Sequence, residues 1–500
     1  MEPSSRLQKI VAYTLPGILF SCLVNVLLSL QLSAQNLPAG TALEVRLSGA
    51  TGSRISHAGD AIEATIIAPV TVHGRIVVPQ GSTLLGSVAN ATAIGFGLEH
   101  STASITYSFH TLRLPGGTTV PVNTQTVEVE TAKEHVDEFG TVHGIHPIVS
   151  LSSSLSFCAV PLLFVDPPIG ASALAIKSLI APSPDPEIRF PAGTELVLAL
   201  NAAVSIPPSN TAFVPTKSFS QGDLTEIEHL LKNTAQRTYM GNRPSDVINV
   251  LLFASHKQMD RAFHASGWAQ AQRKSPMSLY WMYHALARRM GYRSAPMNSL
   301  TLNGVPSAFV HQKSLDTVQK RHHVRVWQYP GRANIWLGAA AEDVGFRFEL
   351  AHWTHSTDPN IDSERAKVVN DLVFTGCVDA AGLLPRPLTD LVQYRNAEHP
   401  ILTDGDIAAV RLNACSHPKL MAGVGNTSGF HERGRLVRVL TVFRDDFVRS
   451  NIFFTTYNTL RSLAKRKAGA ATTDVPLING QPRGLDWLTA TTPLQSPAGK

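Results

Sequence analysis

The chain has 500 residues, of which 44% are hydrophobic and 16% are charged, and its formal net charge is +6 at pH 7. This hydrophobic content is sufficient for two or three domains with cores of their own, which excludes an intrinsically disordered chain. The positive charge is small and both signs are interspersed along the chain, so no nucleic acid is expected as a partner.

Residues 1–34 have the pattern of an export signal. Arg6 and Lys9 precede an uncharged apolar run over residues 10–32, and a small-residue cleavage site follows at Ala34. The same run is long enough to serve as a membrane anchor if it is retained. We therefore expect an exported protein of the periplasm or cell envelope, with a signal peptide or a membrane anchor at its start.

Three cysteines follow this segment, namely Cys158, Cys377 and Cys415. They allow one disulfide at most, and no CxxC pair is present to hold a structural zinc ion. Cys377 and Cys415 are candidates for a nucleophile or for the two partners of one disulfide. We favour a third interpretation, in which both are small buried hydrophobic residues.

Four tight turns divide the first half of the chain, and each combines a proline with a glycine: residues 38–41, 79–82, 115–118 and 191–194. The segments between them are rich in β-branched residues and alternate with period two, which is typical of strands.

An N-terminal all-β barrel over residues 37–205 accounts for this pattern, because closure removes exposed sheet edges. The phrase "FPAGTELVLAL" before residue 201 repeats "LPAGTALEVRL" after residue 36, so we expect the last strand to lie beside the first. An insertion at residues 145–180 is rich in serine, proline and small apolar residues. We favour a packed insertion there over a membrane hairpin.

The barrel phrases "PQGSTLLG" and "AGDAIEAT" resemble those of TrbI-like envelope proteins of secretion and conjugation machines. This resemblance implies a β-barrel domain and an envelope setting.

The pattern changes after a predicted linker at residues 206–222. The segment "SDVINVLLFAS" predicts a buried strand, Ser255 is placed to cap the next helix, and Gly267 is placed to end it. Further strands and helices alternate, which predicts a C-terminal α/β or α+β domain at residues 240–450. The composition of residues 468–500, rich in Ala, Thr, Pro and Gly, predicts a disordered tail.

Two segments of this domain concentrate titratable side chains. In the predicted strand "RHHVRVWQ", His322 lies on one face, and His323 and Arg325 lie on the other. About thirty residues later, "THSTDPNIDSER" predicts the start of a helix, with Asp358 as N-cap and Pro359 as the first helical residue.

A site built from both segments would bring imidazoles and carboxylates together. If this site binds a divalent metal ion such as zinc, manganese or iron, we expect His323, His355 and Asp362 to be its ligands, with an open position for water. No nucleophile elbow, phosphate-binding loop or dinucleotide fingerprint occurs in the sequence.

The ordered motifs "SDVINVLLFAS", "RHHVRVW" and "THSTDPNIDSERAKVVNDLVFTG" resemble the LssY C-terminal domain family over residues 240–440. The resemblance implies an envelope setting with lipid or phosphate chemistry. It also implies the following candidate site residues: Arg321, His322, His323, Arg325, His355, Asp358, Asp362, Glu364 and Arg365. The candidates for catalysis among them are Arg321, His322, His323, Arg325, Asp358, Glu364 and Arg365, so His323 is a candidate for both roles.

Three functions remain open from the sequence. The chain is a binding or structural module of the bacterial envelope whose His/Arg/Asp cluster fixes the fold, or a metal-assisted hydrolase acting on an envelope lipid or phosphate substrate. The third is a membrane-surface adaptor, suggested by the basic segment "NTLRSLAKRKAG". No small-molecule substrate can be identified from the residues.

Overall fold

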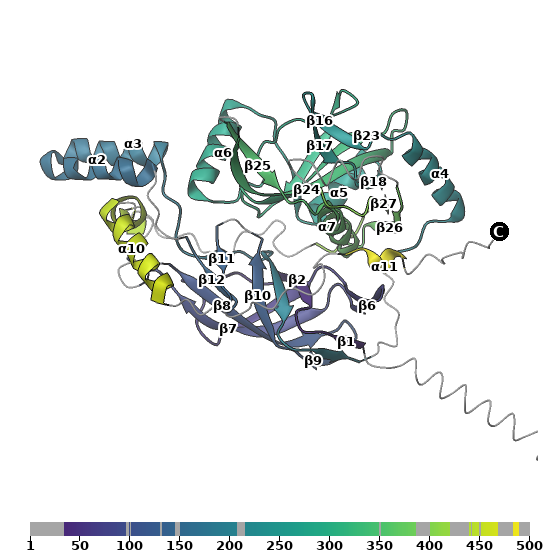
Figure 1. Cartoon of the computed structure of the whole chain (residues 1–500), viewed down its shortest axis with the longest axis horizontal. Helices are drawn as coiled ribbons and strands as arrows, with labels where there is room; N and C mark the ends of the chain where they lie inside the picture. Colours follow the sequence, from purple (N-terminus) through teal and green to yellow (C-terminus); the bar gives the residue numbers. More distant parts are fainter. Residues whose placement is uncertain are drawn as a thin grey trace, which may run out of the picture.

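The computed structural model consists of two domains, the barrel and a C-terminal domain (Figure 1). It describes residues 35–96, 100, 102–130, 133–145, 151–207, 216–349, 352–386, 401–420, 440–441, 443–449, 452–468 and 484–489. The predicted signal peptide or anchor at residues 1–34 lies outside these residues.

The N-terminal domain is the predicted all-β barrel. Its strands are β1 (Gln35–Leu37), β2 (Ala42–Leu47), β3 (Thr51–Gly52), β4 (Ala61–Ile66), β5 (Val70–Val72), β6 (Arg75–Val78), β7 (Thr83–Thr92), β8 (Ser104–Arg113), β9 (Thr119–Pro121), β10 (Thr124–Val129), β11 (His135–Val136), β12 (Thr141–His143), β13 (Arg189–Phe190), β14 (Glu195–Leu200) and β15 (Val204–Ile206). The main sheet has the order β10-β14-β2-β4-β7-β8-β12-β11, with β9 beside β8. Because Val122 N donates to His110 O at 3.0 Å, the start of β10 returns to β8 and the barrel is nearly closed.

The repeated phrases pair as expected. β14 lies antiparallel to β2, with Leu198 opposite Leu43 and Glu195 opposite Arg46. The four Pro-Gly turns use a glycine with positive φ as their third residue, for example Gly40 at 80° and Gly193 at 95°. Glycine suits these turns because it lacks the Cβ that disfavours this backbone conformation.

The insertion forms two helices between β12 and β13, α2 (Leu151–Val165) and α3 (Pro167–Ile180). Asp166 caps α3 by accepting a hydrogen bond from Ile169 N. Within the part of the chain that the structure describes, no helix combines the length and the apolar character needed to cross a membrane.

The C-terminal domain is built on a mixed sheet, which confirms the predicted α/β or α+β class. Its strands are β16 (Arg237–Met240), β17 (Arg243–Val247), β18 (Val250–Phe253), β19 (Trp268–Gln270), β20 (Thr301–Leu302), β21 (Val305–Pro306), β22 (Phe309–Lys313), β23 (Arg321–Gln328), β24 (Ile335–Glu349), β25 (His352–Thr357), β26 (Val378–Leu384) and β27 (Ile407–Leu412). The main sheet has the order β19-β22-β23-β24-β18-β27-β26, with β25 beside β24, and only the β18–β27 pair among these described strands is parallel.

Helices cover both faces of this sheet. On one face, α5 (His256–Ala265) and α7 (Ile361–Phe374) pack in a core that includes Val324 and Val326. On the other face, α4 (Gln221–Lys232) packs in a core that includes Trp327. Because α4 contributes to this core, the domain begins before the predicted residue 240.

Local signals set several helix ends. Ser255 caps α5 through a capping box with Gln258, and Gly267, with φ of 81°, follows the end of that helix as predicted. The next helix, α6 (Pro276–Arg288), ends with Arg289 in the left-handed conformation.

The predicted disordered tail at residues 468–500 was wrong over residues 484–489. Residues 484–489 do not belong to a disordered tail, because α11 (Asp486–Thr489) and the preceding residue bury Leu485, Trp487 and Leu488 in the C-terminal core. The prediction relied on the average composition of residues 468–500, which does not show that a few apolar residues within them pack into the core. Within the predicted 240–450 domain, Arg444 of the π-helix η1 (Arg444–Arg449) pairs with Glu187 of the first domain at 3.0 Å. Among the described residues, the last helix longer than one turn is α10 (Ile452–Ala468).

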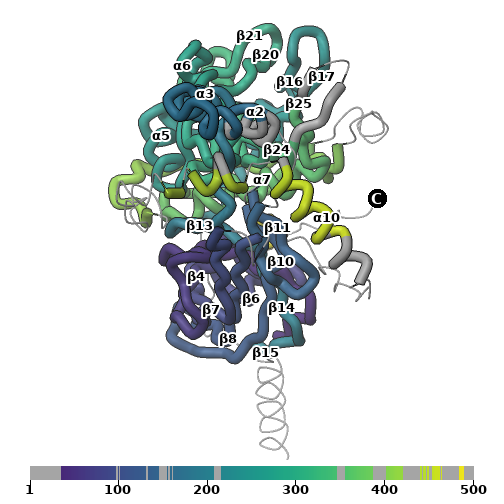
Figure 2. The backbone as a smooth tube through the Cα atoms, turned by 90° about the vertical axis from the view of Figure 1, so that its left-hand side faces the viewer, coloured from purple at the N-terminus to yellow at the C-terminus, as the bar shows by residue number. Residues whose placement is uncertain are grey.

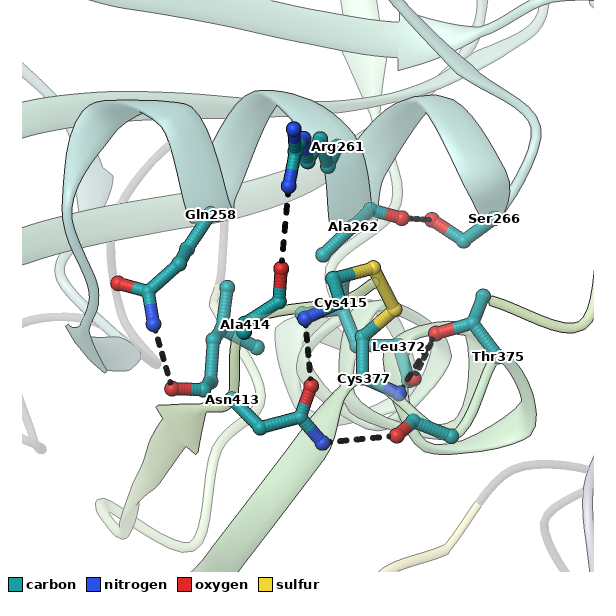
Figure 3. The surroundings of a disulfide bond; sticks show 12 residues. Gln258, Arg261, Ala262, Ser266, Leu372, Thr375, Cys377, Asn413, Ala414 and Cys415 are labelled. Carbon is teal, nitrogen blue, oxygen red and sulfur yellow. Dashed lines mark hydrogen bonds between the residues drawn. A yellow bond between two sulfur atoms is a disulfide. The ribbon is translucent and has the colours of Figure 1, made fainter. Parts of the chain in front are cut away.

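The favoured interpretation of Cys377 and Cys415 as separate buried residues was wrong, since they form a disulfide (Figure 3). Cys377 follows α7 and Cys415 follows β27, so the bond ties a helix end to a strand end across 38 residues of sequence. Asn413 supports this turn by accepting a hydrogen bond from Cys415 N at 2.7 Å. Cys158 of α2 is a free, exposed thiol.

Candidate functional site

The two faces of β23 carry two different polar clusters. β23 pairs with β24, with Arg321 opposite Asp343 and His322 opposite Glu342. As the period-two pattern predicts, His322 points to the α7 side, while His323 contacts Arg325 on the opposite side.

The His323 face is centred on the carboxylate of Asp343. Arg321 Nε donates to Asp343 Oδ2 at 3.0 Å, and the Nδ1 atoms of His323 and His355 lie 3.8 and 3.4 Å from the same oxygen. Arg325 Nη1 donates to Asp246 Oδ2 of β17 at 2.6 Å and contacts His323 Nε2 at 2.7 Å.

Burial and neighbouring charge set the protonation of this face. Burial, followed by the positive charge of Arg325, holds the pKa of His323 well below its usual value. A neutral His323 can accept the Arg325 hydrogen bond at Nε2. Burial would raise the pKa of Asp343, but the electrostatic effect of the surrounding side chains, His323 and Arg321 foremost, lowers it overall. The face is therefore an anionic carboxylate enclosed by arginines and neutral imidazoles.

The opposite face contains what we call the His322 cluster: His322, Glu130, Glu342 and Glu364. His322 Nδ1 donates to Glu364 Oε2 of α7 at 2.7 Å and lies 3.7 Å from Glu342 Oε2. His322 Nε2 bonds to Glu130, which comes from the barrel directly after β10. All four residues are buried.

The His322 ring is surrounded by negative charge. Burial alone would lower the pKa of His322, but the carboxylates of Glu364, Glu342 and Glu130 outweigh it and hold the pKa well above its usual value. The ring is thus an imidazolium that donates from both nitrogens. Asp316, which accepts from His322 N at 2.8 Å, has its pKa raised by burial to about 6.

A second buried cluster joins the two domains, and we call it the interdomain ion network. It consists of three acidic and three basic side chains: Glu44, Arg46 and Glu195 of the barrel, and Lys313, Lys367 and Asp371 of the C-terminal domain. Lys313 Nζ lies 2.8 Å from both Glu195 and Asp371, and Lys367 binds both Glu44 and Glu195. Burial would raise the pKa of Glu195, but Lys313, Lys367 and Arg46 hold it well below its usual value.

Asp358 is not the helix cap that the sequence predicted. α7 begins at Ile361, and Asn360 is its N-cap, with Asn360 Oδ1 accepting from Ser363 N at 3.3 Å. Asp358 Oδ1 instead accepts from Asn360 N at 2.7 Å, which forms a turn just before the helix. Asparagine caps as well as aspartate does, so the helix can start two residues later than the Asp-Pro pair suggested.

The predicted metal ligands do not converge. His323 and His355 both approach Asp343, whereas Asp362 accepts from Thr403 Oγ1 at 2.7 Å and from Asp404 N at 2.6 Å. His323 of β23 and His355 of β25 therefore lie near one carboxylate, while Asp362 in the first turn of α7 bonds to another segment. The spacing of these residues in the sequence does not show this separation.

Arg365 ties the start of α7 to the segment that precedes β27. Its two Nη atoms donate to the two carboxylate oxygens of Asp404, each at 2.8 Å, and Nη1 also donates to Asp406 O at 2.5 Å. Such a two-point pairing fixes geometry and leaves little of the guanidinium for a substrate.

One group in the described residues has the spacing of a metal site: Glu130, His322 and Glu342, with ligand atoms within 4.8 Å of one another. Glu364 lies beside it, and its Oε1 is buried without a hydrogen-bond partner. Two or three carboxylates with one imidazole suit a hard or borderline divalent cation.

Sequence reasoning missed most of the carboxylates that matter here. Glu342 and Asp343 follow the apolar run "WLGAAA", and the pairing of two strands of this kind could have placed them opposite Arg321 and His322. Glu130 is 192 residues from His322 and belongs to another domain, so no local signal pointed to it.

The comparisons with known proteins bear on the C-terminal domain first. Residues 229–407 match the family model described as LssY C-terminus. A search of curated proteins found no match.

Among solved structures, the chain is similar to ComB10 of the Com Type IV secretion system of Helicobacter pylori, at 13% sequence identity. The similarity covers 36% of this chain and 95% of that chain, with a TM-score of 0.21. A score this low carries no conclusion about function. The family match therefore carries the comparison: residues 229–407 of this chain are similar to the LssY C-terminus family.

Proposed function

We propose that this chain is a binding or structural module of the cell envelope, in which the candidate site residues hold the fold and join its two domains. The observation that supports this most is the internal pairing of those residues: Arg321 with Asp343, His322 with Glu364, and Arg365 with Asp404. Their charges are compensated by other side chains of the protein.

Burial argues in the same direction. A general acid or base must come within hydrogen-bonding distance of its substrate. His322 and His323 are 1% and 2% exposed, and their ring nitrogens already face protein groups. A buried network in which most polar groups are paired favours one packing arrangement over its alternatives.

A metal-assisted hydrolase is the second candidate, and the Glu130–His322–Glu342 group favours it. A divalent cation held there would polarise a phosphate or ester oxygen and lower the pKa of bound water. The arginines of the opposite face would not reach such a centre, because they lie across the sheet.

Metal analysis of the full chain separates the two candidates. After purification without chelators, we expect no metal in proportion to protein, and the same thermal midpoint in chelator and in added zinc, manganese or magnesium. Stoichiometric metal that is lost in Glu130→Gln but kept in Glu128→Gln would instead establish the metal centre. Glu128 is the matched control because it is a neighbouring carboxylate that is 49% exposed.

An oxidising compartment is part of the proposal. The Cys377–Cys415 bond supports it, since disulfides persist outside the reducing cytosol. The apolar run at residues 10–32 provides an independent reason to expect export.

N-terminal sequencing and thiol alkylation of the protein from its own cells test this export. We expect the mature chain to begin near Gln35, and two more thiols to react after reduction than before it. A chain that retains Met1 and reacts at both Cys377 and Cys415 without reductant would contradict it.

A further inference from the structure

Large apolar side chains are exposed along the insertion. At the end of α2, Phe164 and Val165 are each 82% exposed. In α3, Ile176 and Leu179 lie three residues apart, on the same side of the helix, and are also exposed. Such side chains on a soluble surface usually mark a contact with another molecule or a membrane.

Helix α6 exposes a second group of large side chains. Met277 is 64% and Trp281 is 52% exposed, and Tyr280 and Tyr283 are exposed beside them. Tryptophan and tyrosine favour the boundary between water and lipid, because each has an apolar ring and a polar group.

Helix α10 is turned so that its apolar side faces outward. Tyr457, Leu460 and Leu463 are exposed at intervals of three residues, while the polar Thr455 and Asn458 are buried. A helix that only covered a water-soluble protein would have the opposite orientation.

The helices α2, α3, α6 and α10 lie on one side of the molecule (Figure 2), and we call their exposed apolar side chains the apolar face. Tyr283 of α6 donates a hydrogen bond to Ile180 O at the end of α3, and α2 packs beside α10. Figure 1 shows α2 and α3 beside α6 and above α10, and Figure 2 shows all four helices on the side that faces the viewer.

The charged residues within these four helices are all basic, although Asp166 joins α2 to α3 and Asp445 lies in η1 beside α2. None of the helices α2, α3, α6 and α10 contains an aspartate or glutamate. Arg273 and Lys274 precede α6, and Arg288 ends it. The sequence of α10 includes four basic residues: Arg461, Lys465, Arg466 and Lys467.

We propose that the apolar face docks on the surface of a lipid bilayer that contains anionic headgroups. Exposed apolar and aromatic side chains with flanking basic residues are the pattern of helices that lie in the membrane interface. At 13 to 17 residues, α2, α3, α6 and α10 are too short to span the hydrocarbon core, so they lie along it. The proposal goes beyond the proposed function and shares no residue with the His322 cluster or the interdomain ion network.

Fluorescence of Trp281 provides a local test in the full chain. Among the tryptophans whose side chains the structure describes, only Trp281 is exposed, and residues 1–34 contain no tryptophan. With vesicles of phosphatidylglycerol and phosphatidylcholine brominated on their acyl chains, we expect partial quenching. Trp281→Phe should abolish this quenching, and vesicles of phosphatidylcholine alone should reduce it. A segment elsewhere in the chain cannot produce this pattern.

Charge placed on the apolar face should prevent docking. The double variant Ile176→Glu, Leu179→Glu should lose the quenching of Trp281, whereas Val305→Glu should keep it. Val305 is the matched control, since it is 61% exposed on β21 and lies outside these helices. Far-UV circular dichroism confirms that each variant is folded.

Three results would overturn the proposal. They are absence of quenching in anionic vesicles, equal quenching in purely zwitterionic vesicles, and a lipid-free dimer that the double variant dissociates. The last would assign the apolar face to a second copy of the chain.

Discussion

Lys367→Met is expected to lower the free energy of unfolding of the full chain by about 3–5 kcal/mol. Lys367 is 1% exposed, and its ammonium group binds both Glu44 and Glu195 of the barrel. Without the ammonium group of Lys367, the buried carboxylates of Glu44 and Glu195 lose a cationic partner. The free energy of burying an unpaired charge is greater than that of losing one hydrogen bond. Denaturant unfolding followed by circular dichroism measures the change.

The exposed pair Lys217–Asp379 provides the matched control. Its lysine is 80% exposed and its Nζ lies 3.2 Å from the carboxylate. Lys217→Met removes the same charge from solvent-screened surroundings, so we expect a change within about 0.5 kcal/mol. Equal effects of the two substitutions would show that the interdomain ion network adds nothing beyond an ordinary surface pair.

The location of Lys367 explains one limit of sequence reasoning. In "DSERAKVVNDLVF", the charged residues of the helix suggest a solvent-facing side. In the structure Lys367, Asn370 and Asp371 are buried because the barrel covers that side of α7. A second domain covers one face of a helix through contacts between segments that are distant in sequence. The periodicity of the helix itself does not predict these contacts.

Features that depend on local sequence or on strand periodicity could be predicted more reliably from the sequence. The alternation of β23 placed His322 and His323 on opposite faces, and the repeated barrel phrases placed β14 beside β2. Both are consequences of backbone geometry within one or two segments. The partners of those side chains were not accessible in this way, as Glu130 and Asp246 show, because each comes from a strand or loop remote in sequence.

The opposite environments of the two neighbouring histidines lead to the last prediction. The folded-state pKa of His322 lies well above its unfolded value, which is about 6.5. Its contribution to stability is therefore fully present below that value and is lost as the pH rises through the folded pKa. For His323 the folded pKa is well below the unfolded value, so its contribution is present above about pH 6.5 and is lost as the pH falls through the folded pKa.

His322→Gln should accordingly destabilise the protein most in mildly acidic solution. There we expect a loss of about 3–5 kcal/mol, since Glu130 and Glu364 lose the cation between them. The difference between wild type and variant should narrow as the pH rises above neutral, because His322 is then neutral in the unfolded chain and folding must take up a proton. Groups that titrate in both proteins cancel in this difference.

His57→Gln serves as the control for this series, because His57 is 82% exposed and pairs only loosely with Asp60, at 3.6 Å. Its stability should follow that of the wild type at every pH. His323→Gln should show the opposite trend from His322→Gln, with a deficit that shrinks as the pH falls. If the deficit of His322→Gln stayed constant or grew with rising pH, His322 would not be an imidazolium between carboxylates, and the electrostatic account of the His322 cluster would be wrong.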